Sequence, residues 1–313
     1  MKIKKISGLV AAPFAPMKDD GDLNLEIIPS YYNLLERNGV AGAFINGTTG
    51  EGVSLSMDEK KSVTDAWVKS GKEGKGLKII NLVGGTSVKD CIELARFSSL
   101  KGLDAVSVIS PHYLKPSSVN ELASFIKEVA DHVPGMPVYY YHIPALSGVN
   151  FPMLELLKVS RESIPNFAGI KYSHNDLMDF FSCLNYDGGY YDMLWGTDQT
   201  LTSALVLGCK GAVGSTYNYL APLFSLLIKN FESGNTGKAL ELQQQANEMI
   251  YLLDKYGGIR TGKAFMRYIG LNCGKFRTPL NNFDEDTYMD LCKDIEALKV
   301  KENMFSLPEK ILS

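Results

Sequence analysis

The alternation of short apolar runs with longer amphipathic segments most constrains the fold of this chain of 313 residues. Such runs suit strands buried in a parallel sheet, and the segments between them suit crossover helices. Right-handed crossovers repeated eight times curl a sheet onto itself, so the pattern predicts an α/β fold, a (β/α)8 TIM barrel. The eight predicted strands are Gly8–Phe14, Gly42–Ile45, Lys78–Val83, Ala105–Ile109, Val138–Tyr141, Phe167–Lys171, Asp192–Trp195 and Gly211–Val213.

Individual helices carry their own signals. Apolar residues within Ser118–His132 follow three- and four-residue spacing, and Ser118 with Glu121 three positions later is typical of a capped helix start. Ser87–Leu100 has a similar apolar stripe with Gly102 just beyond its end, and Gly39 is expected to close a helix that ends near residue 37.

The alternation stops near Ser233, and three segments without intervening strands follow. They are predicted helices at Gly237–Tyr256, Thr261–Gly270 and Asp284–Lys299. We therefore expect residues 1–233 to form the barrel with the active site and residues 234–313 to form a C-terminal helical extension. No linker rich in Gly, Ser or Pro separates them, so the extension should pack on the barrel.

Composition excludes several classes of function. The net charge of -3 and pI near 5.9 provide no basic surface for nucleic acid. The five cysteines are dispersed and never form a C-x-x-C pair, so neither a disulfide framework nor a zinc cluster is predicted. The basic and then apolar start is interrupted by Pro13 and Pro16, and no apolar run has membrane length. We expect a soluble, cytoplasmic protein with no membrane partner.

Lys171 ends the apolar run of residues 167–170. A lysine is rarely placed at the end of a buried strand without a partner or a purpose, which makes it a candidate nucleophile. The alternative is a strand cap whose ammonium lies in solvent.

Polar or glycine-rich loops follow six of the eight strands, at the carboxyl face where barrel enzymes place their chemistry. They are NGTTGEG (46–52), SPHYLKP (110–116), YHIPALSG (141–148), the residues from Lys171 to Ser173, GTDQ (196–199) and GSTYN (214–218). A loop such as NGTTGEG can bind a carboxylate or phosphate, or can be a plain structural turn. The tyrosines at 139–141 can fill the core, or one phenol can shuttle protons beside Lys171.

Other mechanisms lack their motifs. The four histidines are scattered, and no H-x-H or H-E-x-x-H pair or carboxylate cluster predicts a metal site. No G-x-S-x-G sequence marks a nucleophilic serine, and no Walker or G-x-G-x-x-G motif marks a nucleotide site. A mechanism centred on a lysine needs the fewest additional assumptions.

With these loops identified, the chain resembles the pyruvate-dependent class I aldolases, the family of the dihydrodipicolinate synthases and N-acetylneuraminate lyases. The resemblance covers nearly the whole chain. Its motifs are GTTGE (47–51), the Tyr-x-x-Pro of YHIP (141–144), GIK (169–171) and GSTYN (214–218).

The resemblance implies roles for individual residues. Lys171 matches the Schiff-base lysine, Tyr141 the proton-transfer tyrosine and Tyr113 a tyrosine that reaches into a neighbouring subunit's site. The remaining matches concern substrate binding: Thr48 and Thr49 for the keto-acid carboxylate, Ser173 at the wall of the site, and Gly196, Asp198, Gln199 and Ser215 for the sugar.

The segment ALSG (145–148) bears on substrate choice. The synthases normally carry an arginine there for a second carboxylate, so a neutral polyol is expected here. The resemblance to the sialic acid lyases implies reversible cleavage of N-acetylneuraminate to pyruvate and N-acetylmannosamine, with no cofactor, in a homotetramer. Gln199 stands where these lyases usually have glutamate. A 2-keto-3-deoxygluconate aldolase, a dihydrodipicolinate synthase and a non-catalytic sugar-acid-binding barrel are the alternatives.

Overall fold

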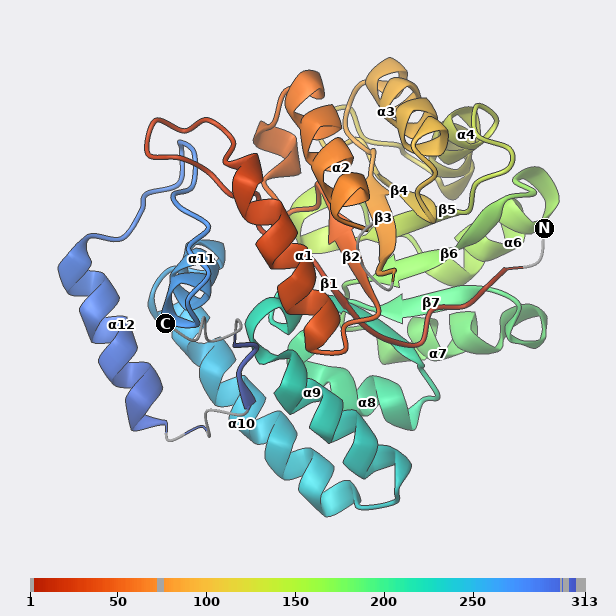
Figure 1. The fold of residues 1–313 in the computed structure, drawn as a ribbon. Helices are drawn as coiled ribbons and strands as arrows, with labels where there is room; N and C mark the ends of the chain where they lie inside the picture. The colour runs from red at the N-terminus through yellow and green to blue at the C-terminus, as the bar shows by residue number, and fades with distance from the viewer. Residues whose placement is uncertain (1–2, 72–75, 299, 301–303, 308–313) are drawn as a thin grey trace.

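The structure, a computed structural model, describes residues 3–71, 76–298, 300 and 304–307. Eight parallel strands follow one another around a closed barrel, which confirms the predicted (β/α)8 fold (Figure 1). The strands are β1 (Gly8–Ala11), β2 (Gly42–Ile45), β3 (Lys78–Leu82), β4 (Ala105–Ile109), β5 (Val138–His142), β6 (Phe167–Tyr172), β7 (Asp192–Trp195) and β8 (Gly211–Gly214).

The first strand is shorter than the sequence predicts. It ends at Ala11, three residues before the predicted Phe14. The backbone N–H of Ala12 still donates to the carbonyl of Gly214 at 2.9 Å, whereas Pro13 has no N–H to continue the ladder.

Helices surround the strands, as Figure 1 shows. They are α1 (Ile28–Arg37), α2 (Met57–Gly71), α3 (Val88–Leu100), α4 (Val119–Ala130), α5 (Pro144–Ser147), α6 (Met153–Ser163), α7 (Leu177–Asn185), α8 (Leu201–Val206) and α9 (Tyr217–Glu232). The predicted start of α4 is confirmed, because the Ser118 hydroxyl accepts a hydrogen bond from the N–H of Glu121 at 3.2 Å. Gly39 and Gly102 have φ of 71° and 75° and follow the ends of α1 and α3, in agreement with their predicted positions.

Inward-facing side chains fill the barrel, while the outward-facing ones pack under the helices. The interior cluster includes Phe44, Leu82, Tyr139 and Tyr141, and the outer layer includes Tyr140. This alternation along β5 is the one expected from strand geometry.

Strand β6 breaks that alternation at one place. Phe167, Ile170 and Tyr172 face outward, whereas Ala168 faces the interior. The register of β5 against β6 shifts here: Val138 pairs with Phe167, but Tyr139 pairs with Gly169. This extra residue reverses the phase of the strand, so Lys171 faces inward beside Tyr141.

Three further helices form the C-terminal part of the chain: α10 (Thr236–Lys255), α11 (Ile259–Tyr268) and α12 (Glu285–Ala297). They lie on one side of the barrel near α1 and α9 (Figure 1). The apolar face of α10, which includes Leu242 and Met249, is buried in the same core as the barrel helices. Lys299, the predicted end of the last helix, lies outside the described residues. In the part of the chain that the structure describes, no helix is both long and apolar enough to cross a bilayer.

Candidate active site

A cavity of about 290 Å³ opens at the carboxyl end of the barrel. Residues at or just after six strand ends, those of β1, β2, β5, β6, β7 and β8, and residues from the C-terminal helices line it. Eight of the residues predicted for the site contribute to this lining: Thr48, Thr49, Tyr141, Lys171, Gly196, Asp198, Gln199 and Ser215. The predicted residues at the carboxyl ends of β5 and β6 and in the loops after β2, β7 and β8 therefore converge on one space, as the barrel topology predicts.

Lys171 is only 4% exposed, so its predicted alternative as a solvent-facing strand cap is wrong. Its Nζ lies 3.9 Å from the ring centre of Tyr141 and 4.1 Å from that of Phe44. Among the described residues, no carboxylate lies within 4.0 Å of this ammonium. The aromatic rings of Phe44 and Tyr141 therefore form the immediate surroundings of this side chain.

Tyr141 is the direct neighbour of Lys171 across the pairing of β5 with β6. Its ring packs edge to face against Phe44, with the ring centres 5.6 Å apart. The ring therefore has a fixed position at the cavity wall, close to the amine.

Thr48 and Thr49 lie in a tight loop between two residues with left-handed backbone conformations. Asn46 has φ of 55° and Glu51 has φ of 53°. The loop then closes on itself, because a Cβ at Gly52 would lie 1.9 Å from the carbonyl oxygen of Asn46. Only glycine can occupy this position without moving the loop.

Asp198 begins a short 3-10 turn, Asp198–Thr200, directly after β7. Its Oδ2 accepts hydrogen bonds from the N–H and the hydroxyl of Thr216, at 3.1 and 2.6 Å. Burial raises the pKa of Asp198, and the Thr216 hydrogen bonds and the charge of Lys171 oppose that rise. A Cβ at Gly214 would lie 1.9 Å from Oδ1, so the glycine of GSTYN leaves room for this carboxylate.

Ser173 lies behind the cavity wall rather than in its lining. Its hydroxyl donates to the carbonyl oxygen of Gly196 at 3.1 Å. A Cβ at Gly196 would lie only 2.0 Å from that hydroxyl, so the two residues fit together only because one is glycine.

Tyr113 is not brought to the cavity of its own chain. It follows β4 and is 85% exposed, and Leu114 beside it is exposed as well. Its predicted role in a neighbouring subunit stays a prediction.

The C-terminal helices supply lining residues that the sequence analysis missed. Leu253, Asp254, Gly258, Ile259 and Gly262 form one side of the cavity. The glycine pair at 257–258 before α11 indicates that the backbone there lies close to another group. Nothing in the sequence indicates that this group is the cavity at the barrel end.

One glutamine of α10 also holds the site together. The side-chain amide of Gln243 donates to the carbonyl of Asp198 at 3.1 Å, and its oxygen accepts from the N–H of Thr202 at the same distance. The helix therefore contacts the turn that carries Asp198 and Gln199.

Within the described ranges, no group of three or more His, Cys, Asp or Glu side chains is arranged to hold a metal ion.

The fold and the site together define a barrel enzyme whose buried amine faces a substrate-sized cavity. The chain belongs to the dihydrodipicolinate synthetase family, whose model matches residues 5–298. It is 42% identical to the N-acetylneuraminate lyase of Danio rerio over 283 residues, which is 89% of this chain and 92% of the relative. The human N-acetylneuraminate lyase is also 42% identical, over 88% of each chain.

A solved structure leads to the same family. The N-acetylneuraminate lyase of Proteus mirabilis matches with a TM-score of 0.91 at 36% identity, over 94% of this chain and 99% of that one. The family that the sequence motifs indicated is therefore confirmed.

Proposed function

We propose that this protein is a class I aldolase that reversibly cleaves N-acetylneuraminate to pyruvate and N-acetylmannosamine. The observation that carries the proposal is Lys171, a buried amine without a carboxylate partner among the described residues, beside a phenol in the cavity. It supports amine chemistry because Lys171 lines the cavity, where its Nζ can attack the carbonyl carbon of a bound ketone. The 42% identity to N-acetylneuraminate lyases supports the choice of substrate.

In this mechanism, Nζ of Lys171 adds to the ketone carbon of the sugar acid, and loss of water gives a protonated imine. Tyr141 takes the proton of the hydroxyl on the carbon β to the imine. The carbon–carbon bond next to that hydroxyl then breaks, which forms the aldehyde of N-acetylmannosamine. The electron pair of the broken carbon–carbon bond moves into the protonated imine, which becomes an enamine. Protonation of the enamine and addition of water release pyruvate and restore the free amine.

We assign the keto-acid carboxylate to the hydroxyls and backbone N–H groups of Thr48 and Thr49, because both residues line the cavity. We assign the sugar to Asp198, Gln199 and Ser215, which also line the cavity. The amide of Gln199 can both donate to and accept from sugar hydroxyls, so it serves a neutral polyol without adding charge.

The segment after β5 supports a neutral second half of the substrate. Helix α5 carries Ala145, Leu146 and Ser147, and the Ser147 hydroxyl donates to the carbonyl of Ile143. Lys115 approaches Gly148 from the β4 loop but does not line the cavity. A substrate with a second carboxylate, as in a dihydrodipicolinate synthase, has less support here.

We also propose residues 1–233 as the catalytic barrel and 234–313 as its extension, in a cytoplasmic homotetramer. The exposed Tyr113 and Leu114 support this assembly, because large exposed apolar side chains at a loop tip favour contact with another subunit. In it, Tyr113 serves as the third catalytic residue, in the site of a neighbour.

Incubation with pyruvate and borohydride tests the mechanism. We expect reduction to fix an adduct at Lys171, which peptide mass spectrometry locates. Absence of the adduct would exclude the Schiff base, and binding of N-acetylneuraminate without turnover would favour a non-catalytic barrel. N-acetylneuraminate should release pyruvate faster than 2-keto-3-deoxygluconate, and the reverse order would indicate a hexonate aldolase.

A further inference from the structure

The glutamate of the GTTGE motif has no part in the proposed chemistry, yet it is buried. Glu51 and Lys263 of α11 form an ion pair of 2.7 Å, with side chains only 4% and 3% exposed. The two residues are 212 positions apart in the chain. The pair therefore joins the loop after β2 to the C-terminal helices inside the protein.

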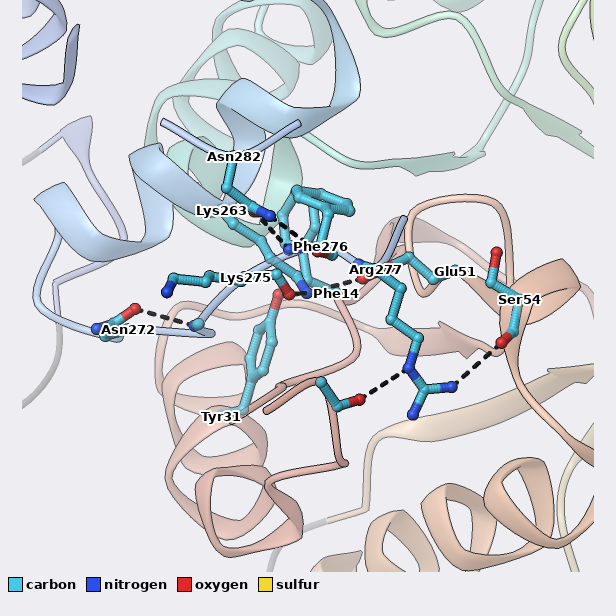
Figure 2. Close-up of polar contacts among 12 residues, drawn as sticks. Phe14, Tyr31, Glu51, Ser54, Lys263, Asn272, Lys275, Phe276, Arg277 and Asn282 are labelled. Atoms are coloured by element: carbon cyan, nitrogen blue, oxygen red, sulfur yellow. Dashed lines mark hydrogen bonds and ion pairs between the residues drawn. The ribbon is translucent and has the colours of Figure 1, made fainter. Parts of the chain in front are cut away.

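Both Glu51 and Lys263 have further hydrogen-bond partners, and Figure 2 shows these residues close together. The other carboxylate oxygen of Glu51 accepts from the backbone N–H of Arg277 at 3.0 Å. Lys263 also donates to the carbonyl of Lys275 at 2.6 Å, and its ammonium lies 4.4 Å from the ring centre of Phe276. Two segments of the C-terminal region, helix α11 and the loop at 275–277, therefore hold one glutamate.

That glutamate ends the turn that carries the threonines. Its N–H donates to the carbonyl of Thr48 at 3.1 Å, and its own backbone is left-handed. At the start of the turn, Asn46 is also left-handed, and its amide donates to Asn81 at 2.9 Å. Residues other than glycine rarely adopt this left-handed conformation. The side-chain contacts of Asn46 and Glu51 therefore stabilise the backbone at the two ends of the turn.

Helix α11 also approaches the cavity directly next to Lys263. A Cβ at Gly262 would lie 2.3 Å from the ring of Phe14, and both residues line the cavity. Movement of α11 would therefore change the cavity wall and the turn together.

We propose that Glu51 and Lys263 are positioning residues that hold Thr48 and Thr49 where they bind the keto-acid carboxylate, so that the C-terminal helices set the affinity for the keto acid. The inference rests on the proposed function, because it assumes that these threonines bind that carboxylate. Burial lowers the pKa of Lys263, and the charge of Glu51 opposes that change, which agrees with a lysine held away from water by its partner.

The variants separate positioning from stability. Lys263→Met removes the ammonium but keeps an apolar stem against Phe276, and it leaves Glu51 charged and buried. The double variant E51Q/K263M removes both charges, which should restore most of the stability lost in K263M. Glu51→Gln alone keeps the size and a hydrogen bond to Lys263 but removes the carboxylate charge.

The readout is the concentration of pyruvate that gives half-maximal borohydride trapping at Lys171, measured together with thermal unfolding. We expect E51Q/K263M to need at least about tenfold more pyruvate than the parent, with the same trapped fraction at saturation. E51Q should need an intermediate concentration. A merely structural pair predicts instead that the half-saturating concentration is unchanged wherever the variant is folded.

Arg267→Gln is the matched control. Arg267 lies one turn beyond Lys263 on α11 and forms a bidentate pair with Glu285 at 2.9 and 2.8 Å, exposed on the surface. This variant should trap pyruvate at the parent's concentration. If E51Q, or the folded double variant, also has the parent's value, the positioning role is wrong while the aldolase mechanism stands. If the parent itself traps no pyruvate, the proposed function fails and this inference fails with it.

Discussion

The two ends of the barrel interior differ in how their buried polar side chains are paired. Tyr139 and Tyr141 are two residues apart on β5, and both face inward. At the amino end, the hydroxyl of Tyr139 donates to Oδ2 of Asp192 at 2.8 Å, and the N–H of Ile6 donates to the same oxygen at 3.0 Å. The polar groups at this end satisfy one another.

At the carboxyl end, the polar groups do not satisfy one another. The ammonium of Lys171 contacts aromatic rings, and Oδ1 of Asp198 has no hydrogen-bond partner among the described residues. Buried polar atoms are nearly always paired in folded proteins, so groups left unpaired beside a cavity indicate a ligand that completes them. The amino end therefore stabilises the barrel, and the carboxyl end is organised for a substrate.

The largest expected effect comes from Lys171→Met. We expect kcat for N-acetylneuraminate cleavage to fall by at least about 10⁴-fold, because Lys171 is the only lysine among the described residues that line the cavity. The melting temperature should stay equal or rise, since the substitution removes a buried ammonium that has no carboxylate partner in the part of the chain that the structure describes. Steady-state kinetics and thermal unfolding measure both effects. A clear loss of stability would mean that Lys171 belongs with the structural groups of the other end.

The two tyrosines provide the next largest contrast. Tyr141→Phe keeps the ring against Phe44 and removes only the hydroxyl, so kcat should fall by about 10²- to 10³-fold with little change in stability. Tyr139→Phe removes a donor from the buried Asp192, so the free energy of unfolding should fall by about 1–3 kcal/mol with kcat unchanged.

The same substitution two residues apart on one strand is its own control. Urea unfolding and steady-state kinetics on both variants give the comparison. Equal losses of activity would show that the amino end also affects the chemistry, and the distinction between the two ends would be lost.

The sequence was sufficient to predict the barrel and eight of the residues that line the cavity. Apolar runs mark the strands because both faces of a parallel sheet are buried, and the loops after them must meet at one end. Thr48, Tyr141 and Asp198 could be assigned to one site on this reasoning, because each follows or ends a predicted strand.

What the sequence could not predict depends on contacts between distant segments. Strict alternation from the outward-facing Phe167 would turn Lys171 outward, and only the register shift at Gly169 turns it into the barrel. A Cβ at Gly169 would lie 1.8 Å from the carbonyl of Asp192, so this glycine permits the close approach of β7. Nor does any local pattern show that Ile259 would face the cavity or that Lys263 would pair with Glu51.

The smallest expected effect concerns the outer face of the same strand end. His142 follows Tyr141 and is buried outside the barrel, with its ring centre 5.0 Å from that of Tyr172. Burial lowers its pKa to about 3. The folded protein keeps this imidazole neutral, whereas the unfolded chain binds a proton below about pH 6.5. Stability should therefore decrease as the pH falls from about 6.5 toward 3, by about 1.4 kcal/mol per unit from this group alone.

His142→Phe removes that titration and keeps an aromatic ring among Tyr140, Tyr172 and His174. The free energy of unfolding of the parent and the variant, measured by urea titration between about pH 6 and 4, should differ in slope by one proton, with the parent steeper. Above about pH 7 the imidazole is neutral in both the folded and the unfolded protein. The two slopes should therefore coincide there and provide the control. Equal slopes at acid pH would mean that the folded protein accommodates the charged imidazole. The outer face of β5 would then resemble the substrate end, which admits polar partners. It would differ from the amino end, where the polar groups hydrogen-bond to one another.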